Sequence, residues 1–123
     1  MTGATDGVGK EFAGQLASQG MNIILMSRSL DKLKTVADSI TKDFGVRTKV
    51  IQIDFSKATV ETYERIAEKE LKGLEIGVLV NNVGVYVSYP KPVGEMELDI
   101  LWSHATVNVG ATLMMTRLVI PQM

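Results

Sequence analysis

Thr2 to Gly9 have the sequence TGATDGVG, in which glycine occupies positions 3, 7 and 9. Glycines at this spacing usually form the turn from a strand into a helix, where backbone N–H groups and the positive end of the helix dipole hold a phosphate. We expect Gly3 to permit the tight turn, Gly7 the approach of a pyrophosphate, and Gly9 the close packing of the helix. Only Met1 precedes this loop, so we expect its leading strand to be missing and the chain to be part of a longer protein.

The rest of the chain alternates between the patterns of helices and strands. Apolar stripes at helical spacing predict helices over residues 10–19, 29–44, 59–72 and 97–120. Short apolar runs predict strands at residues 22–26, 48–53 and 75–80. We expect a surface loop at 85–93 and an interruption of the last helix near 104–106. Alternation of this kind is typical of βαβ units, so we predict one α/β domain with an incomplete, doubly wound parallel sheet.

The composition limits the classes of function. With 46% apolar and 22% charged residues and a net charge of −1, the chain has the balance of a soluble domain. It lacks the excess of Lys and Arg that nucleic-acid binding needs. Its cysteine count is zero and its only histidine is His104, which excludes disulfides, thiolate chemistry and a histidine-based metal site. No apolar run approaches the roughly 20 residues that span a bilayer, so we expect no membrane segment here.

Two further motifs follow predicted strands, at the edge where open α/β sheets bind their ligands. Ser27 and Arg28 occupy the place where NAD sites carry an acidic residue that binds the ribose 2′-hydroxyl. A basic residue there favours the 2′-phosphate of NADP, although Arg28 taken alone is also compatible with a solvated surface charge. Asn81-Asn82-Val83-Gly84 follows the predicted strand 75–80, and taken alone this motif is compatible with a plain turn.

Together these motifs resemble the short-chain dehydrogenase/reductase family over essentially the whole chain. They are Thr-Gly-x-x-x-Gly-x-Gly, the missing acid after the next strand, Asp54 after the third strand, and Asn-Asn-x-Gly after the fourth. The glycine spacing differs from Gly-x-Gly-x-x-Gly of the better-known dinucleotide fingerprint, and this difference indicates the family. The stretches GATDGVGK, LMSRSLDKL, NNVG and LVIPQM resemble one branch. That branch contains very-long-chain 3-oxoacyl-CoA reductases, 17β-hydroxysteroid dehydrogenases of types 3 and 12, and an inactive dehydrogenase-like relative.

The resemblance implies a Rossmann-like fold and assigns NADPH-binding roles to four groups of residues. The glycine loop would line the pyrophosphate and the adenosine ribose, and the pair after the second strand would bind the 2′-phosphate. The residues after the third strand would bind the adenine amino group, and those after the fourth strand would lie under the ribose next to the nicotinamide. In this order the residues are Gly3, Thr5, Asp6, Gly7, Val8 and Gly9, then Ser27 and Arg28, then Asp54 and Phe55, then Asn82, Val83 and Gly84.

The resemblance also assigns one catalytic residue. Asn108 matches the tetrad asparagine that kinks its helix and holds a water in the proton relay, and its alternative is a helix-interior asparagine without a chemical role. His104 and Trp102 match no role in the family. The family reduces a carbonyl with hydride from the nicotinamide, while a tyrosine tuned by a lysine four residues later donates the proton. No Tyr-x-x-x-Lys occurs in this sequence, so we expect these residues alone to be inactive.

For the parent protein, the resemblance implies an NADPH-dependent carbonyl reductase that acts on a small lipid or steroid substrate, 3-oxoacyl-CoA or a 17-ketosteroid. The alternatives are an NADP-binding pseudoenzyme that lacks the catalytic tyrosine and a truncated isoform with a regulatory role. The resemblance further implies the endoplasmic reticulum as the location and a homodimer through the last helix. In the expected sheet order 3-2-1-4, loss of the first strand leaves an empty slot between strands 22–27 and 76–81. We therefore expect the chain expressed alone to be insoluble or molten.

Overall fold

A computed structural model describes all 123 residues of the chain. Strands β1 (Ile23–Ser27) and β2 (Thr48–Gln52) pair in parallel, with Ile23 opposite Thr48 and Ser27 opposite Gln52. Both strands lie where the apolar runs predicted them. Side chains of β1 alternate between the two faces of the sheet, so Leu25 packs with one buried cluster and Met26 with the other.

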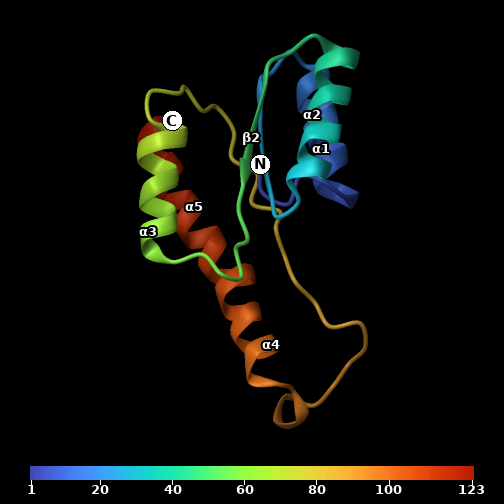
Figure 1. Cartoon of the computed structure of the whole chain (residues 1–123), viewed down its shortest axis with the longest axis vertical. Coiled ribbons are helices and arrows are strands. Elements are labelled where there is room, and N and C mark those ends of the chain that lie inside the picture. The colour runs from blue at the N-terminus through green and yellow to red at the C-terminus, as the bar shows by residue number, and fades with distance from the viewer.

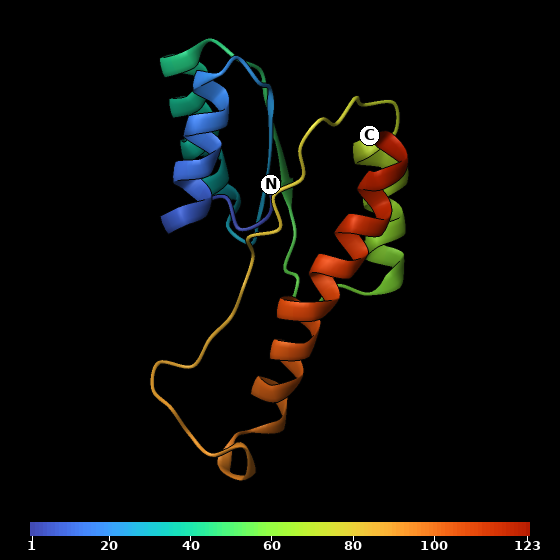
Figure 2. The same ribbon diagram turned by 180° about the vertical axis from the view of Figure 1, so that it is seen from behind.

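Helices cover both faces of this sheet, as Figures 1 and 2 show from opposite sides. Helices α1 (Gly7–Ser18) and α2 (Leu30–Phe44) lie on one face. Helices α3 (Val60–Arg65) and α5 (Thr112–Val119) lie on the other face. The structure therefore confirms the predicted α/β architecture with a doubly wound parallel sheet, and the two buried clusters are its two interfaces between helices and sheet.

The sequence of α2 explains both its ends and its buried side. The Ser29 hydroxyl accepts a hydrogen bond from the Lys32 N–H at 3.4 Å, which caps the first turn. Gly45 ends the helix in the left-handed conformation, with φ of 68°, which glycine adopts without steric cost. Between these ends the buried side chains are Leu33, Val36, Ala37 and Ile40. Their helical spacing directs one stripe toward β1 and α1.

The prediction of a buried strand at 75–80 is wrong. These residues form no helix or strand, and Val78 retains 45% of its exposed area. A strand needs a ladder of backbone hydrogen bonds, but the segment makes only one backbone-to-backbone bond toward the sheet, from the Thr2 N–H to the Val80 carbonyl at 3.1 Å. The backbones of Gly77, Val78 and Leu79 make no hydrogen bond. A cavity of about 670 Å³ separates this segment from β1.

The first residues of the chain occupy one end of the slot beside β1, so the expectation of an empty slot is corrected. The Met1 amino group donates to the Ile24 carbonyl at 2.8 Å, and the Met26 N–H donates to the Met1 carbonyl at 3.0 Å. Thr2 forms a parallel bridge with Met26. The lateral order is therefore β2, β1, Thr2 and Val80, which agrees with the expected order of strands. The prediction about solubility stays untested.

The last helical region is one bent rod with three parts (Figure 1). Helix α4 (Leu98–Ser103) leads into the π-helical segment η3 (His104–Ala111), which continues into α5. The interruption predicted at 104–106 is thus a longer widening of the helix. Short 3₁₀ turns η2 (Val93–Glu95) and η4 (Ile120–Gln122) flank the rod, and the π segment η1 (Ile66–Leu71) extends α3. None of these helices has the length and apolar character required to cross a bilayer.

Candidate functional site

A cavity of about 650 Å³ opens where the chain leaves the carboxyl ends of β1 and β2. Four loops that are distant in sequence meet there: the glycine loop, the turn after β1, the turn after β2 and residues 82–86. Open α/β sheets bind their ligands at this edge. The residues predicted from the sequence that line the cavity are Gly3, Thr5, Asp6, Gly7, Ser27, Arg28, Asp54, Phe55, Asn82, Val83 and Gly84.

The glycine loop presents the free end of a helix to this cavity. Gly3 and Gly7 have φ values of 63° and 47°, a conformation that L side chains rarely adopt. Asp6 stands at the N-cap of α1, but its side chain caps no backbone N–H. The carboxylate of Asp6 instead accepts from the Lys32 ammonium at 3.2 Å. The first N–H groups of α1 therefore have no side-chain partner, which leaves them free for an anion.

Two side chains hold the glycine loop against residues 82–83. The fully buried Thr2 hydroxyl accepts from the backbone N–H groups of Asn82 at 2.9 Å and Val83 at 3.0 Å. In return, the Asn82 side chain donates to the carbonyls of Thr2 at 3.2 Å and Gly3 at 3.0 Å. A Cβ atom at Gly9 would lie 2.2 Å from the Gly3 carbonyl oxygen and 2.4 Å from Asn82 Nδ2. Only glycine therefore fits at position 9.

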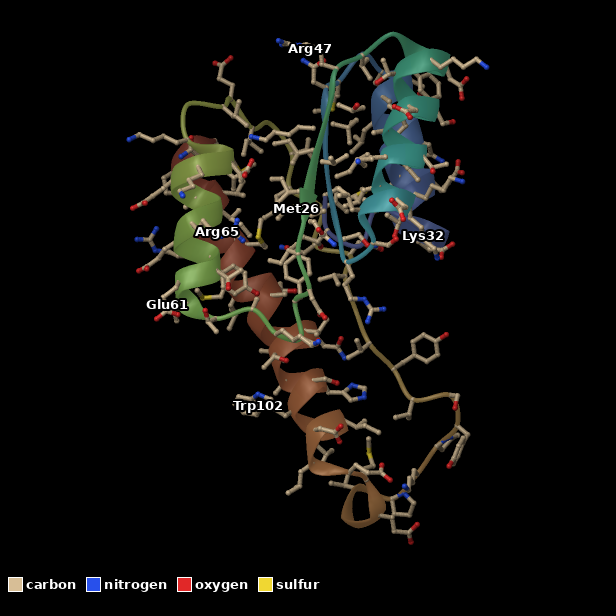
Figure 3. All side chains as sticks on the ribbon, viewed as in Figure 1. Met26, Lys32, Arg47, Glu61, Arg65 and Trp102 are labelled. Carbon is tan, nitrogen blue, oxygen red and sulfur yellow. The ribbon has the colours of Figure 1, made fainter.

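Positive charge gathers beside the turn after β1. Arg28 lines the cavity, and its carbonyl accepts from Gln52 Nε2 at 2.9 Å, which ties the turn to β2. The Ser27 hydroxyl lies 3.0 Å from that of Thr5, which ties the same turn to the glycine loop. Lys32 reaches the cavity from the first turn of α2. Figure 3 places Lys32 at the same end of α2 as the cavity and Arg47 at the opposite end of the sheet.

Asp54 is an ionised acceptor in the turn after β2. Its Oδ1 accepts from the Ser56 hydroxyl at 2.7 Å and from the Ser56 N–H at 3.0 Å. Burial raises the pKa of Asp54, but these two hydrogen bonds, aided by the charges of Arg28 and Lys57, outweigh burial and hold the pKa below its usual value. The adjacent Phe55 is buried, and the centroid of its ring lies 6.5 Å from the centroid of the Tyr63 ring.

Three predicted site residues do not line the cavity. Gly9 is buried under the glycine loop. Val8 lies on the outside of α1, where it is 66% exposed to solvent. Asn108 lies one residue beyond Val107, which does line the cavity. The Asn108 amide bonds to both backbone groups of Val85. Asn108 thus contacts the wall of the cavity from behind.

The cavity also contains residues that sequence reasoning missed. These are Ser29, Lys32, Ile53, Ser56, Val85, Tyr86 and Val107. For Lys32 a signal existed, because a residue four positions after Arg28, in the first turn of the predicted helix, returns to the same end of the sheet. Ser56 could also have been found, since a serine two residues after an aspartate commonly bonds back to its carboxylate. For Val85 and Val107, position depends on the path of the loop and on η3.

Comparison with known proteins places this geometry in a family. Residues 1–123 match the short chain dehydrogenase family. The chain is 45% identical over 126 residues to very-long-chain 3-oxoacyl-CoA reductase-A of Danio rerio, covering 100% of this chain and 38% of that protein. It is 45% identical over 123 residues to inactive hydroxysteroid dehydrogenase-like protein 1 of Homo sapiens, covering 100% of this chain and 37% of that protein. The chain thus spans well under half the length of these curated relatives.

Among solved structures, the chain resembles L-sorbose reductase of Gluconobacter frateurii complexed with NADPH and L-sorbose. The TM-score is 0.84 at 28% sequence identity, and the match covers 100% of this chain and 46% of that chain. The cavity described above therefore lies in a fold that the reductase shares.

Proposed function

This chain belongs to the short chain dehydrogenase family, and we propose that it is the NADP(H)-binding part of a carbonyl reductase. The observation that carries the proposal is one cavity that contains an uncapped helix N-terminus together with Arg28 and Lys32. An uncapped helix N-terminus favours a pyrophosphate, and two cations beside the turn after β1 favour an additional phosphate. No carboxylate stands at that turn to accept a ribose 2′-hydroxyl, which favours NADP over NAD.

The residues present fit this cofactor. Gly7 has open space where a Cβ would stand, so the backbone of the glycine loop is accessible to a pyrophosphate. Arg28, Ser27 and Lys32 would hold the 2′-phosphate. Asp54 has a second carboxylate oxygen, Oδ2, that no group of the protein uses, and it could accept from an amino group. When bound, NADPH supplies a hydride to a carbonyl carbon.

The reductase activity is a proposal for the whole protein, because this chain contains no Tyr-x-x-x-Lys and covers less than half of its relatives. The substrate class we propose is a 3-oxoacyl-CoA, which the 45% identity to the reductase of Danio rerio supports, or a 17-ketosteroid, which the resemblance of the sequence motifs implies. The contribution of these residues is to bind and orient the cofactor. Asn108 supplies the asparagine that the family uses in its proton relay.

An alternative function is an NADP-binding pseudoenzyme. The 45% identity to a human relative named inactive supports it equally well, and both alternatives use the same cofactor cavity. The endoplasmic reticulum and a homodimer through the last helix remain proposals taken from the family. The whole protein would distinguish the two functions by whether it oxidises NADPH when a 3-oxoacyl-CoA or a 17-ketosteroid is added.

Cofactor titration tests the shared part of both alternatives. We expect the whole protein that contains this chain to bind NADPH more tightly than NADH, as measured by the increase in nicotinamide fluorescence. Arg28→Ala removes a charged hydrogen-bond donor, so affinity for NADPH should fall about tenfold or more while affinity for NADH is unchanged. Arg47→Ala, at the opposite end of the sheet, is the matched control and should bind NADPH normally. Equal affinity for NADPH and NADH in the unmodified protein would contradict the proposal.

A further inference from the structure

Asn108 holds Val85 through both ends of its side-chain amide. Oδ1 accepts from the Val85 N–H at 2.8 Å, and Nδ2 donates to the Val85 carbonyl at 2.9 Å. The amide thus occupies the place of a neighbouring strand for one residue of an otherwise unpaired loop. Val85 and the preceding Gly84 both line the candidate cofactor cavity. A Cβ at Gly84 would lie 3.5 Å from Asn108 Oδ1, so this wall of the cavity rests directly on the Asn108 side chain.

The only histidine of the chain contacts the same amide. His104 lies one helical turn before Asn108 in η3, and its Nδ1 is 3.1 Å from Asn108 Nδ2. The two bonds to Val85 fix which end of the amide is nitrogen, because only Nδ2 can donate to a carbonyl. The second hydrogen of Nδ2 is then directed to His104 Nδ1. His104 therefore accepts at Nδ1 and carries its proton on Nε2.

We propose that His104 is a positioning residue for Asn108, which it holds in the orientation that fixes Val85 at the wall of the cofactor cavity. The inference rests on the proposed function insofar as that cavity binds NADP(H). The interaction requires a neutral His104 ring. A proton on Nδ1 would face the hydrogens of Nδ2, and rotating the amide by half a turn would set Nδ2 against the Val85 N–H. A proton on Nδ1 and the contact with Nδ2 therefore cannot coexist while both bonds to Val85 are present.

No charged partner in the structure offsets this conflict. Ionisable side chains on the rod and on the segment leading into it are Tyr86, Tyr89, Lys91, Glu95, Glu97, Asp99 and Arg117. Lys91 pairs with Glu97 at 3.3 Å, and none of the three ion pairs in the molecule includes His104.

Two substitutions at position 104 test whether Asn108 needs a hydrogen-bond acceptor there or only a side chain that fills the space. His104→Asn places a carbonyl oxygen near the position of Nδ1 and so keeps a hydrogen-bond acceptor there. His104→Leu fills a similar space without an acceptor. The readout is the Val85 amide signal in ¹H–¹⁵N spectra of the protein, together with its hydrogen-exchange rate at one fixed pH. NADPH affinity is measured on the same samples at pH 8.

We expect Val85 to exchange at least about fivefold faster in His104→Leu and at the unmodified rate in His104→Asn. NADPH affinity should fall a few-fold in His104→Leu and recover in His104→Asn. An unchanged Val85 exchange rate in His104→Leu, or a rate in His104→Asn as fast as in His104→Leu, would overturn the inference. A normal NADPH affinity in His104→Leu would also overturn it.

If the unmodified protein fails to bind NADPH at all, the proposed function fails by itself. The Val85 measurements need no cofactor, so they still decide whether His104 holds Asn108. The two failures are therefore distinguishable.

Discussion

The Asn82 side chain donates a hydrogen bond to the Gly3 carbonyl at 3.0 Å and joins parts of the chain that are 79 residues apart. The same Nδ2 donates to the Thr2 carbonyl at 3.2 Å. The partly buried amide thus keeps the glycine loop against the segment that follows the 75–80 region. A donor in this place stabilises two backbone carbonyls, so its chemistry should matter more than its shape.

Replacing Asn82 by an isosteric acceptor tests this relationship. Asn82→Asp places a carboxylate oxygen against the Thr2 and Gly3 carbonyls, and we expect the free energy of unfolding to fall by about 2–3 kcal/mol. Urea titration measures the change. Asn81→Asp is the matched control, because the exposed Asn81 bonds only to the Thr116 hydroxyl, which can donate to a carboxylate. Equal losses in the two variants would contradict the prediction.

Glycine 9 should not tolerate even a methyl group. Gly9→Ala places Cβ within 2.4 Å of the Gly3 carbonyl oxygen and Asn82 Nδ2, so the loop must shift, at a cost of about 1–3 kcal/mol. The shift of the loop should also weaken the binding of NADPH. Gly14→Ala in the same helix meets nothing within 4 Å and should instead stabilise the protein by about 0.5–1 kcal/mol. Thermal unfolding of both variants gives the comparison, and a stable Gly9→Ala protein would refute the close packing.

Lys32 should contribute to cofactor selectivity although it lies outside the sequence motifs. Lys32→Ala removes an ammonium group that lines the cavity and pairs with Asp6, and we expect affinity for NADPH to fall about tenfold. Affinity for NADH should change little. Lys34→Ala, on the exposed side of the same helix, controls for net charge. If both lysine variants lower the affinity for NADPH equally, the effect of Lys32 is one of long-range charge only.

The titration of Asp54 should respond to Ser56. The pKa of Asp54 is held below its usual value, so its ionised form stabilises the fold above the unfolded pKa, and that stability is lost as the pH falls through the folded pKa. Ser56→Ala removes the hydroxyl donor at 2.7 Å, so the pKa of Asp54 should rise and less stability should be lost in acid. Carboxyl ¹³C titration and urea unfolding at pH 7 and pH 3 measure both effects.

A matched control for this titration is Ser39→Ala, whose hydroxyl donates to the exposed Asp43 at 3.2 Å. This variant should leave the Asp54 titration unchanged. An unchanged pKa of Asp54 in Ser56→Ala would show that the backbone N–H of residue 56 and the nearby cations are sufficient for the shift.

Local patterns predicted the elements whose stability is local. Helix α2 begins after Ser29 and ends at Gly45 because a serine cap and a left-handed glycine act within a few residues of the helix. The apolar run of β1 also predicted a buried strand, since a strand covered on both faces needs no alternation of polar residues. Residues 75–80 have the same apolar pattern, but a strand also needs paired backbone groups, which the pattern does not report.

The composition of the cofactor cavity was likewise predictable only in part. Motifs identified the residues that follow each strand, because parallel strands end at one edge of the sheet. Lys32 was missed although its spacing from Arg28 places it at the same edge, whereas Val85 and Val107 were missed because their positions depend on the path of a loop and on η3. His104 matched no family role, and its contact with Asn108 arises in the π-helical segment η3.

The sequence by itself determined the family, the alternation of helices and strands, and the chemical groups at the carboxyl ends of the strands. These properties follow from spacing along the chain, which short-range sterics and apolar periodicity control. Only the tertiary structure decided which groups meet: Asn82 with Gly3, Lys32 with Asp6, and His104 with Asn108 and Val85. Such contacts depend on directions in space, and a hydrogen bond weakens steeply when its angle or distance changes.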